Sequence, residues 1–188
     1  MRAILFSAAV AAALAFPLAA ADSEGRFAAG YPASLACNAV TTAGPGSETL
    51  FAIAAFSEGW LAAHAKLTPG VFDLTPWQSV EYVVAQLRAY CTARPDDRLI
   101  DALEQLTGFL QPDALREGAE PVAVSNGQQV ILVHPDVLAR IRERLADKGF
   151  SDKGTDDPIA GLRAYQRSIG VTESGLPDQP TLQRLFAP

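Results

Sequence analysis

The sequence predicts a mainly α-helical fold, in which a small helical domain held by one disulfide precedes a three-helix domain with a short β-hairpin. Three observations favour this fold. Apolar residues recur at three- and four-residue steps along most of the chain. The chain contains only two cysteines, Cys37 and Cys91, and Asn126-Gly127 lies between two apolar runs. At 188 residues, the chain can hold one ordinary domain or two small ones.

Residues 1–21 are predicted to form a secretory signal peptide. Arg2 gives the segment a basic start, residues 3–18 form an apolar core, and three alanines precede Asp22. An uncleaved anchor is the alternative, but the segment is short and rich in alanine for a membrane span. We therefore expect a periplasmic protein that has no stable membrane span after cleavage.

Export places the two cysteines in an oxidising compartment, where disulfides form and persist. Because Cys37 and Cys91 are the only pair in the chain, we predict that they bond to each other. Closing a loop of about 54 residues stabilises a fold by roughly 4 kcal/mol in the chain-entropy treatment. A catalytic or metal-binding role for the cysteines would need further histidines or cysteines nearby, and the chain contains only two histidines, His64 and His134.

The net charge of −6 is unevenly distributed along the chain. Residues 22–112 carry ten acidic and five basic side chains, a net charge of −5, whereas residues 134–188 carry eight of each. The acidic part repels nucleic acid and anionic lipid. We therefore expect no nucleic-acid partner.

Two helices are predicted at the start of the first domain. Residues 34–43 form a short helix, and Ser47 caps a longer one that ends near Lys66. Apolar residues form a wide stripe along the longer helix. Glycine costs a helix interior roughly 1 kcal/mol relative to alanine, so Gly59 suggests close packing beside Trp60.

A third and a fourth helix follow. Residues 75–78 have the pattern of a capping box with proline at the first helical position, which predicts the start of the third helix. Cys91 lies on the apolar face of this helix, so its sulfur is expected to point inward. Pro95 ends the helix, and Asp96 or Asp97 is expected to cap the fourth.

The chain carries, in this order, Cys37, residues 58–61, residues 89–91, Pro95 and residues 101–103. This order resembles the HdeA-like family of periplasmic acid-stress proteins, which are small helical domains held by one disulfide. The resemblance covers residues 30–110 and implies that this domain binds client proteins in acid. A family of secreted immunity proteins shares the outline of a Gly-aromatic helix, an acidic loop and a helix ended by proline.

The second domain is predicted to span residues 121–188, after a linker at residues 111–120. Asn126-Gly127 between apolar runs is the strongest short signal for a β-hairpin. Because an isolated hairpin is marginal in water, we expect it to pack on the C-terminal helices.

Three helices are predicted after the hairpin. The first ends at Gly149, where Phe150 provides a C-cap contact. The second begins at Pro158 and ends before Gly170. Asp178 opens the third.

Residues 130–188 carry a helix, Gly-Phe, a helix ending in Tyr-Gln-x-x-x-Gly-Val, then Ser-Gly-Leu-Pro-Asp and Thr-Leu-x-x-Leu. This order resembles the peptidoglycan-binding-domain-like family, a small three-helix cell-wall module, and implies peptidoglycan as a partner. The sequence departs from the family at residues 151–157, where Ser-Asp-Lys-Gly-Thr-Asp-Asp replaces the usual Asp-Gly-x-x-Gly loop. That departure bears on ligand binding more than on the fold.

Polar groups beside the glycine turns of this module are the predicted ligand contacts. Hydroxyl and amide groups suit a glycan or a stem peptide, and arginine suits the carboxylates of the stem. For Tyr165, a place in the apolar core is an equal alternative. The predicted contacts are Arg163, Tyr165, Gln166, Ser174 and Gln179.

No constellation of residues in the sequence supports catalysis. Neither His64 nor His134 lies in a nucleophile or metal-ligand motif, and a zinc site needs three or more protein ligands. We therefore predict a non-enzymatic protein without metal or cofactor. Two functions stay open: binding of unfolded periplasmic proteins under acid stress by a wall-tethered protein, or an adaptor or immunity-type protein that binds one specific partner.

Overall fold

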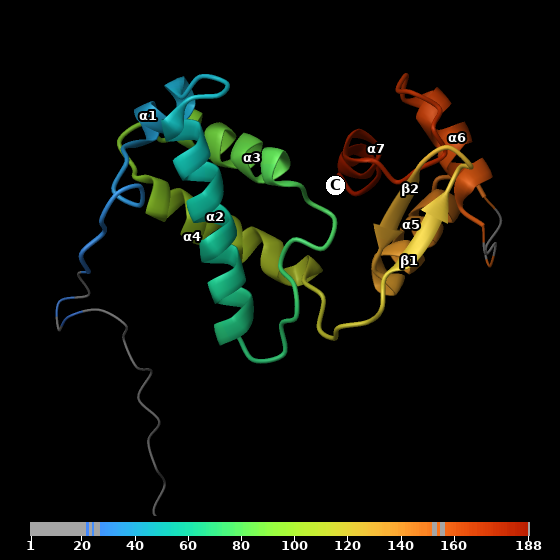
Figure 1. The fold of residues 1–188 in the computed structure, drawn as a ribbon, viewed down its shortest axis with the longest axis horizontal. Helices are drawn as coiled ribbons and strands as arrows, with labels where there is room; N and C mark the ends of the chain where they lie inside the picture. Colours follow the sequence, from blue (N-terminus) through green and yellow to red (C-terminus); the bar gives the residue numbers. More distant parts are fainter. Residues whose placement is uncertain (1–21, 23, 25–26, 152–153, 155–156, 188) are drawn as a thin grey trace, which may run out of the picture.

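The computed structural model describes residues 22, 24, 27–151, 154 and 157–187, so the predicted signal peptide lies outside the described residues. The described chain is mainly helical and forms two lobes (Figure 1). The N-terminal lobe contains α1 (Cys37–Thr42), α2 (Glu48–Leu67), α3 (Val80–Ala93), α4 (Leu99–Leu110) and the short 3-10 helix η1 (Gln111–Asp113). The C-terminal lobe contains β1 (Val122–Ser125), β2 (Val130–Val133), α5 (Pro135–Asp147), α6 (Ile159–Ser168) and α7 (Gln179–Leu185). The predicted mainly helical fold with one short hairpin is confirmed.

The N-terminal lobe is built around the predicted disulfide. Cys37 in α1 and Cys91 in α3 are bonded and fully buried, with 4.8 Å between their Cα atoms. Because α3 packs against α1, α2 and α4, the disulfide joins the start of the lobe to its central helix. Ile53, Leu87 and Leu103 belong to the same apolar core. The pairing of the cysteines and the inward position of Cys91 are confirmed.

The third helix begins later than the sequence predicts. α3 starts at Val80, and the Oγ of Ser79 caps it by accepting a backbone N–H of its first turn at 3.3 Å. Residues 75–78 form no helix. The carboxylate of Asp73 instead accepts the backbone N–H of Thr75 at 2.8 Å, which holds a local turn in place of the first helical turn. The predicted start at residues 75–78 is therefore wrong.

The fourth helix is also capped by a different residue. Arg98 occupies the N-cap position of α4, and its backbone N–H donates to Oδ2 of Asp101 at 2.9 Å. Asp97 instead accepts a hydrogen bond of 2.6 Å from the hydroxyl of Tyr90 on α3. The predicted cap at Asp96 or Asp97 is wrong, because the hydroxyl of Tyr90 engages the Asp97 side chain.

Gly59, in the middle of α2, lacks the close packing predicted beside Trp60. The residue is exposed, and a Cβ atom built on it meets no other atom within 4 Å. Gly59→Ala is therefore expected to raise the free energy of unfolding by about 0.5–1 kcal/mol, because alanine loses less backbone entropy in a helix. Urea unfolding measures the difference. Gly149→Ala is the matched control and is expected to lose stability, because the φ of 78° at Gly149 strains a residue with a side chain. A less stable Gly59→Ala protein would contradict the open environment of this residue.

The first half of the predicted linker, residues 111–120, packs against both lobes. Ala114 belongs to the apolar core of the N-terminal lobe, and Leu115 belongs to that of the C-terminal lobe. The backbone N–H of Leu115 also donates to the carbonyl of Asp73 at 2.8 Å. Only residues 116–120 of this segment are exposed throughout.

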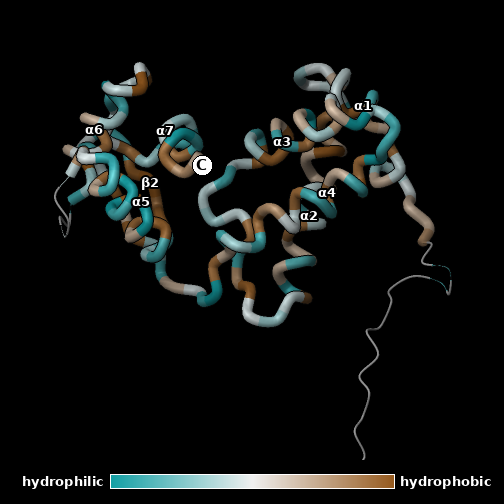
Figure 2. Tube along the Cα trace, turned by 180° about the vertical axis from the view of Figure 1, so that it is seen from behind, coloured by the Kyte–Doolittle hydropathy of each residue, from teal (hydrophilic) through white to brown (hydrophobic). Residues whose placement is uncertain are grey.

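The predicted hairpin is present and packs on the C-terminal helices. β1 and β2 pair antiparallel on either side of Asn126-Gly127, and Val124 and Val133 lie in the second apolar core. Figure 2 shows β2 as a hydrophobic segment. His134 then caps α5, because its Nδ1 accepts the backbone N–H of Asp136 at 3.2 Å.

The ends of the C-terminal helices follow the sequence signals. Gly149 adopts a positive φ of 78° just after α5, and the backbone N–H of Phe150 donates to the carbonyl of Leu145 at 2.8 Å. The Oδ1 of Asp178 caps α7 by accepting the backbone N–H of Thr181 at 3.0 Å. The predicted end of α5 and start of α7 are both confirmed.

The two lobes meet at Trp77, which precedes α3 but packs on the core of the C-terminal lobe. The centroid of its ring lies 5.1 Å from that of Phe186 and 5.3 Å from that of Tyr82. The backbone N–H of Ser79 donates to Oε1 of Gln179 at 2.7 Å. The contacts with Phe186 and Gln179 join the segment before α3 to the C-terminal lobe.

Candidate functional site

Gln166 lies at the centre of the C-terminal lobe and has no exposed surface. Its Nε2 lies 3.0 Å from Oγ of Ser174, 2.9 Å from the carbonyl oxygen of Leu176 and 2.9 Å from Oγ1 of Thr181. Its Oε1 accepts the backbone N–H of Gly175 at 2.8 Å. The amide therefore joins α6, the loop that follows it and α7 through one buried network.

Ser174 and Asp178 extend this network toward the surface. The Oγ of Ser174 accepts the backbone N–H of Leu176 at 3.1 Å and lies 3.0 Å from Oδ2 of Asp178. Across from them, Nδ2 of Asn126 in the hairpin turn donates to the carbonyl oxygen of Ser174 at 3.0 Å. The network thus holds the hairpin turn beside the loop that leads into α7.

The other three predicted contacts lie in different surroundings. Tyr165 is buried, and its ring packs edge-on against that of Phe150, with 5.3 Å between the ring centroids. Burial raises the pKa of the Tyr165 hydroxyl. Arg163 is exposed and lies against Gly175. The Oε1 of Gln179 is bonded to the N-terminal lobe. Of the five predicted residues, Arg163, Gln166 and Ser174 therefore meet around one loop, whereas Tyr165 is in the core and Gln179 is at the contact between lobes. Their role in ligand binding stays a prediction.

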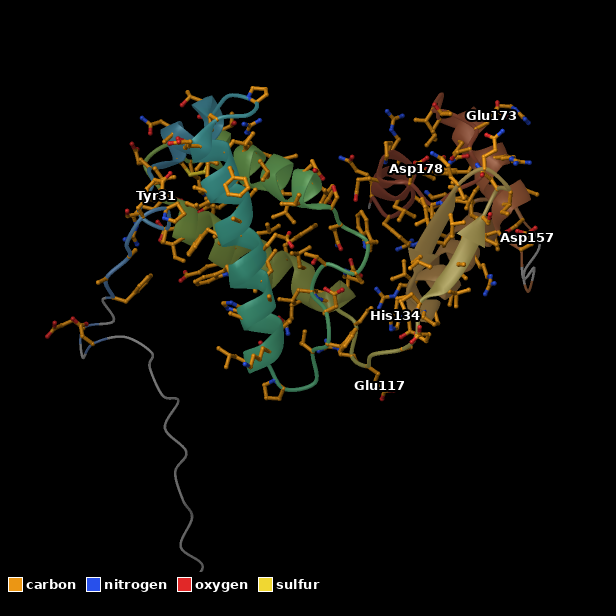
Figure 3. All side chains as sticks on the ribbon, in the orientation of Figure 1. Tyr31, Glu117, His134, Asp157, Glu173 and Asp178 are labelled. Atoms are coloured by element: carbon orange, nitrogen blue, oxygen red, sulfur yellow. A yellow bond between two sulfur atoms is a disulfide. The ribbon has the colours of Figure 1, made fainter. Side chains whose placement is uncertain are left out.

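A groove of about 420 Å³ lies between β2 and the loop before α7, and we call it the hairpin groove. It combines amide, hydroxyl and carboxylate groups with apolar side chains. In Figure 3, Asp178 lies near the hairpin turn, and His134 lies at the opposite end of the hairpin. The groove is lined by Gln129, Val130, Ile131, Ser174, Leu176 and Asp178.

Sequence reasoning identified only Ser174 among the residues that line the hairpin groove. Gln129 and Val130 lie just after the Asn-Gly turn, and that turn is the only signal in the sequence that points to their position. The hydrogen bond from Asn126 to Ser174 brings the hairpin turn, and with it Gln129 and Val130, opposite Ser174. The two bonded residues are 48 positions apart in the chain, so no local pattern in the sequence indicates this contact.

A second and more apolar pocket, of about 480 Å³, lies between α2 and α3; we call it the α2–α3 pocket. Arg88 contributes a cation to its lining, and Nη2 of this arginine donates to the carbonyl oxygen of Ala43. Glu81 and Ala85 also face the pocket from α3. Its apolar lining comes from Leu50, Phe51, Ala54, Val80 and Val84.

Both histidines make local contacts. His64 stacks on Trp60 with 4.7 Å between ring centroids, and His134 caps α5. Within the described ranges, no group of three or more His, Cys, Asp or Glu side chains is placed to hold a metal ion. In the same part of the chain, no helix combines the length and the apolar character needed to cross a membrane.

No protein-family model matches this sequence, and no curated protein and no solved structure matches it either. The comparisons therefore do not support the resemblance to the HdeA-like family or the resemblance to the peptidoglycan-binding-domain-like family. Both remain predictions from the residues that carry them.

Proposed function

We propose that the protein is a non-catalytic periplasmic protein that recognises peptidoglycan through the hairpin groove and binds unfolded client proteins in acid through its N-terminal lobe. The composition of the groove is the observation that carries the first part. The amide of Gln129, the hydroxyl of Ser174 and the carboxylate of Asp178 line it together with the apolar side chains of Val130 and Leu176. Peptidoglycan presents hydroxyl, amide and N-acetyl methyl groups close together. A groove with apolar walls and a few polar groups is suited to orient such a ligand.

Arg163 adds a cation next to this groove. Its side chain is exposed and lies against Gly175, which stands between the groove-lining residues Ser174 and Leu176. The forked guanidinium of an arginine binds carboxylates through two parallel hydrogen bonds. The stem peptides of peptidoglycan carry carboxylates, so Arg163 supports recognition of the stem beside the glycan.

Co-sedimentation of the mature protein with purified sacculi tests the wall-binding proposal. The double substitution Gln129→Ala with Val130→Ala removes two exposed side chains of the groove. It is expected to weaken binding about ten-fold, since one hydrogen bond and one apolar contact are lost. Gln128→Ala, an exposed residue outside the groove, is the matched control and is expected to sediment as the wild type does. A wild-type protein that stays in the supernatant, or a double variant that sediments equally, rejects the proposal.

The charge of the N-terminal region supports binding of clients in acid. Residues 22–112 change from a net charge of −5 to about +6 when their ten carboxylates and His64 are protonated, because five bases and one histidine remain. Repulsion at this charge loosens a small core, and the Cys37–Cys91 disulfide keeps the loosened chain compact. Binding of the dye ANS and suppression of client aggregation, measured between pH 7 and pH 2, test this step. A lobe that stays closed and inert at pH 2 contradicts it.

The ion pair of Arg98 and Asp101 is expected to make the stability of the N-terminal lobe depend on pH in the acid range. A hydrogen bond of 3.0 Å from Nη2 of Arg98 to Oδ1 of Asp101, with the attraction between the two charges, lowers the pKa of the Asp101 carboxyl. A carboxyl whose pKa is lower in the folded state than in the unfolded state adds to the free energy of unfolding. The contribution is complete above the unfolded-state pKa, near 4, and is lost as the pH falls through the folded-state pKa. In urea unfolding, Asp101→Asn is therefore expected to be less stable than the wild type at pH 7 and to converge with it as the pH falls below the folded-state pKa of Asp101. A difference that stays constant from pH 7 to pH 2 would contradict this role of the pair.

An adaptor or immunity-type protein with one specific partner is the second candidate. It is favoured by two aromatic side chains on the N-terminal lobe, Phe51 on α2 and Phe109 on α4, which are 76% and 63% exposed. Aromatic side chains are enriched where proteins bind each other. A pull-down from envelope extract at neutral pH separates the two candidates. Recovery of one stoichiometric partner that Phe109→Ala no longer captures favours the adaptor, whereas client binding that appears only in acid favours the first proposal.

A further inference from the structure

Arg88 is a partly buried cation without an ionic partner in the N-terminal lobe. Its Nη2 donates to the carbonyl oxygen of Ala43, while its Nε is buried and makes no hydrogen bond. No ion pair joins Arg88 to a carboxylate of the residues that the structure describes. Because a guanidinium removed from water is usually matched by a carboxylate or a phosphate, Arg88 retains the capacity to bind an anion.

The α2–α3 pocket places this cation beside a largely apolar surface. From Arg88, the pocket continues between α2 and α3, two helices that pack against each other and run at a steep angle to each other in Figure 1. Its volume of about 480 Å³ lies within the usual range for pockets that take small molecules. The other charged group in its lining, Glu81, is seven residues from Arg88 on α3, about 10 Å along the helix axis. A ligand with one charged end therefore meets a cation at one end of the pocket and an anion at the other.

We propose that the α2–α3 pocket binds a small amphipathic carboxylate, namely an unbranched alkyl chain of medium length with one terminal carboxylate. The carboxylate pairs with the guanidinium of Arg88, which has no ionic partner among the described residues. The alkyl chain lies on Leu50, Ala54 and Val84, where removal of its methylene groups from water supplies most of the affinity. An alkyl ammonium in the same orientation is repelled by Arg88. In the reverse orientation it meets Glu81, an exposed carboxylate whose attraction is screened by water, so the pocket favours a carboxylate head group. This site is separate from the hairpin groove and does not depend on wall binding.

Isothermal titration of the mature protein with decanoate and with decylammonium, both below their micellar concentrations, tests the head group. Decanoate is expected to bind with one-to-one stoichiometry and to raise the melting temperature, whereas decylammonium is expected to bind at least about ten-fold more weakly. Equal binding of the two ligands, or no binding of decanoate, overturns the proposal.

Substitutions at Ala85 test the location of the site. This residue is exposed on α3 and faces the pocket three residues before Arg88, so a new side chain is tolerated by the fold. Ala85→Glu places a carboxylate where it pairs with Arg88 and repels the ligand, and it is expected to weaken decanoate binding about ten-fold or more. Ala85→Lys is expected to leave decanoate binding unchanged or stronger. Ala89→Glu is the matched control on the same helix outside the pocket and is expected to bind decanoate as the wild type does. Equal affinities in Ala85→Glu and Ala89→Glu place the ligand elsewhere and overturn the assignment of this pocket.

Discussion

Replacing both cysteines by alanine, Cys37→Ala with Cys91→Ala, is expected to lower the free energy of unfolding of the N-terminal lobe by about 4 kcal/mol. The disulfide joins residues that are 54 positions apart and closes a long loop. Without it, the unfolded chain has more conformational entropy, which favours unfolding. Both cysteines are fully buried, and the smaller alanine side chains leave gaps that add to the loss. Since small domains are stable by only about 5–15 kcal/mol, this change removes a large part of the total.

Urea unfolding followed by circular dichroism measures the effect of the cysteine substitutions. A reductant added to the wild-type protein is expected to cause a loss of the same order, because it opens the same loop. The double variant is the control for the reductant and is expected to be unaffected by it. A loss below about 1 kcal/mol in the double variant would show that the disulfide contributes little to stability.

Gln166→Ala is expected to destabilise the C-terminal lobe by about 3 kcal/mol or more. The substitution leaves the backbone N–H of Gly175 and the carbonyl oxygen of Leu176 without their partner, and both residues are buried. Each buried polar group that loses its hydrogen bond costs about 1–3 kcal/mol. The loss also releases the loop that forms one wall of the hairpin groove, so binding to sacculi is expected to fall together with stability.

Two further variants separate the hydrogen bonds of Gln166 from its volume. Gln166→Glu keeps the shape of the side chain but puts an acceptor where Nε2 donates to Leu176, so it is also expected to destabilise the lobe. Arg167→Ala is the matched control on the next residue, because it removes only an exposed ion pair with Glu173. Such pairs contribute at most about 1 kcal/mol. A Gln166→Ala protein as stable as Arg167→Ala would contradict the proposed role of the buried network.

The elements that the sequence predicted correctly depend on neighbours close in the chain. Ser47 and Asp178 cap their helices through hydrogen bonds to residues three positions ahead, and Asn126-Gly127 forms its turn locally. Two predicted helix starts failed where a side chain is engaged outside the helical turn that was expected for it. Asp97 bonds to Tyr90 instead of capping α4, and Trp77 packs on the other lobe instead of beginning α3. Such contacts leave no periodic or local pattern in the sequence.

The chain's pattern of apolar residues, caps and turns was sufficient to establish its helical character and its hairpin, because both depend on residues close in the chain. The pairing of the cysteines followed from their number, because two cysteines allow only one pairing. The positions of the hairpin groove, the α2–α3 pocket and the contact between the lobes came from packing. Each of these sites joins segments far apart in the chain: Gln129 and Ser174 line the same groove, Leu50 and Val84 line the same pocket, and the ring of Trp77 contacts that of Phe186. Their meeting reflects the burial of two apolar cores and of the amide of Gln166, which are properties of the folded chain as a whole.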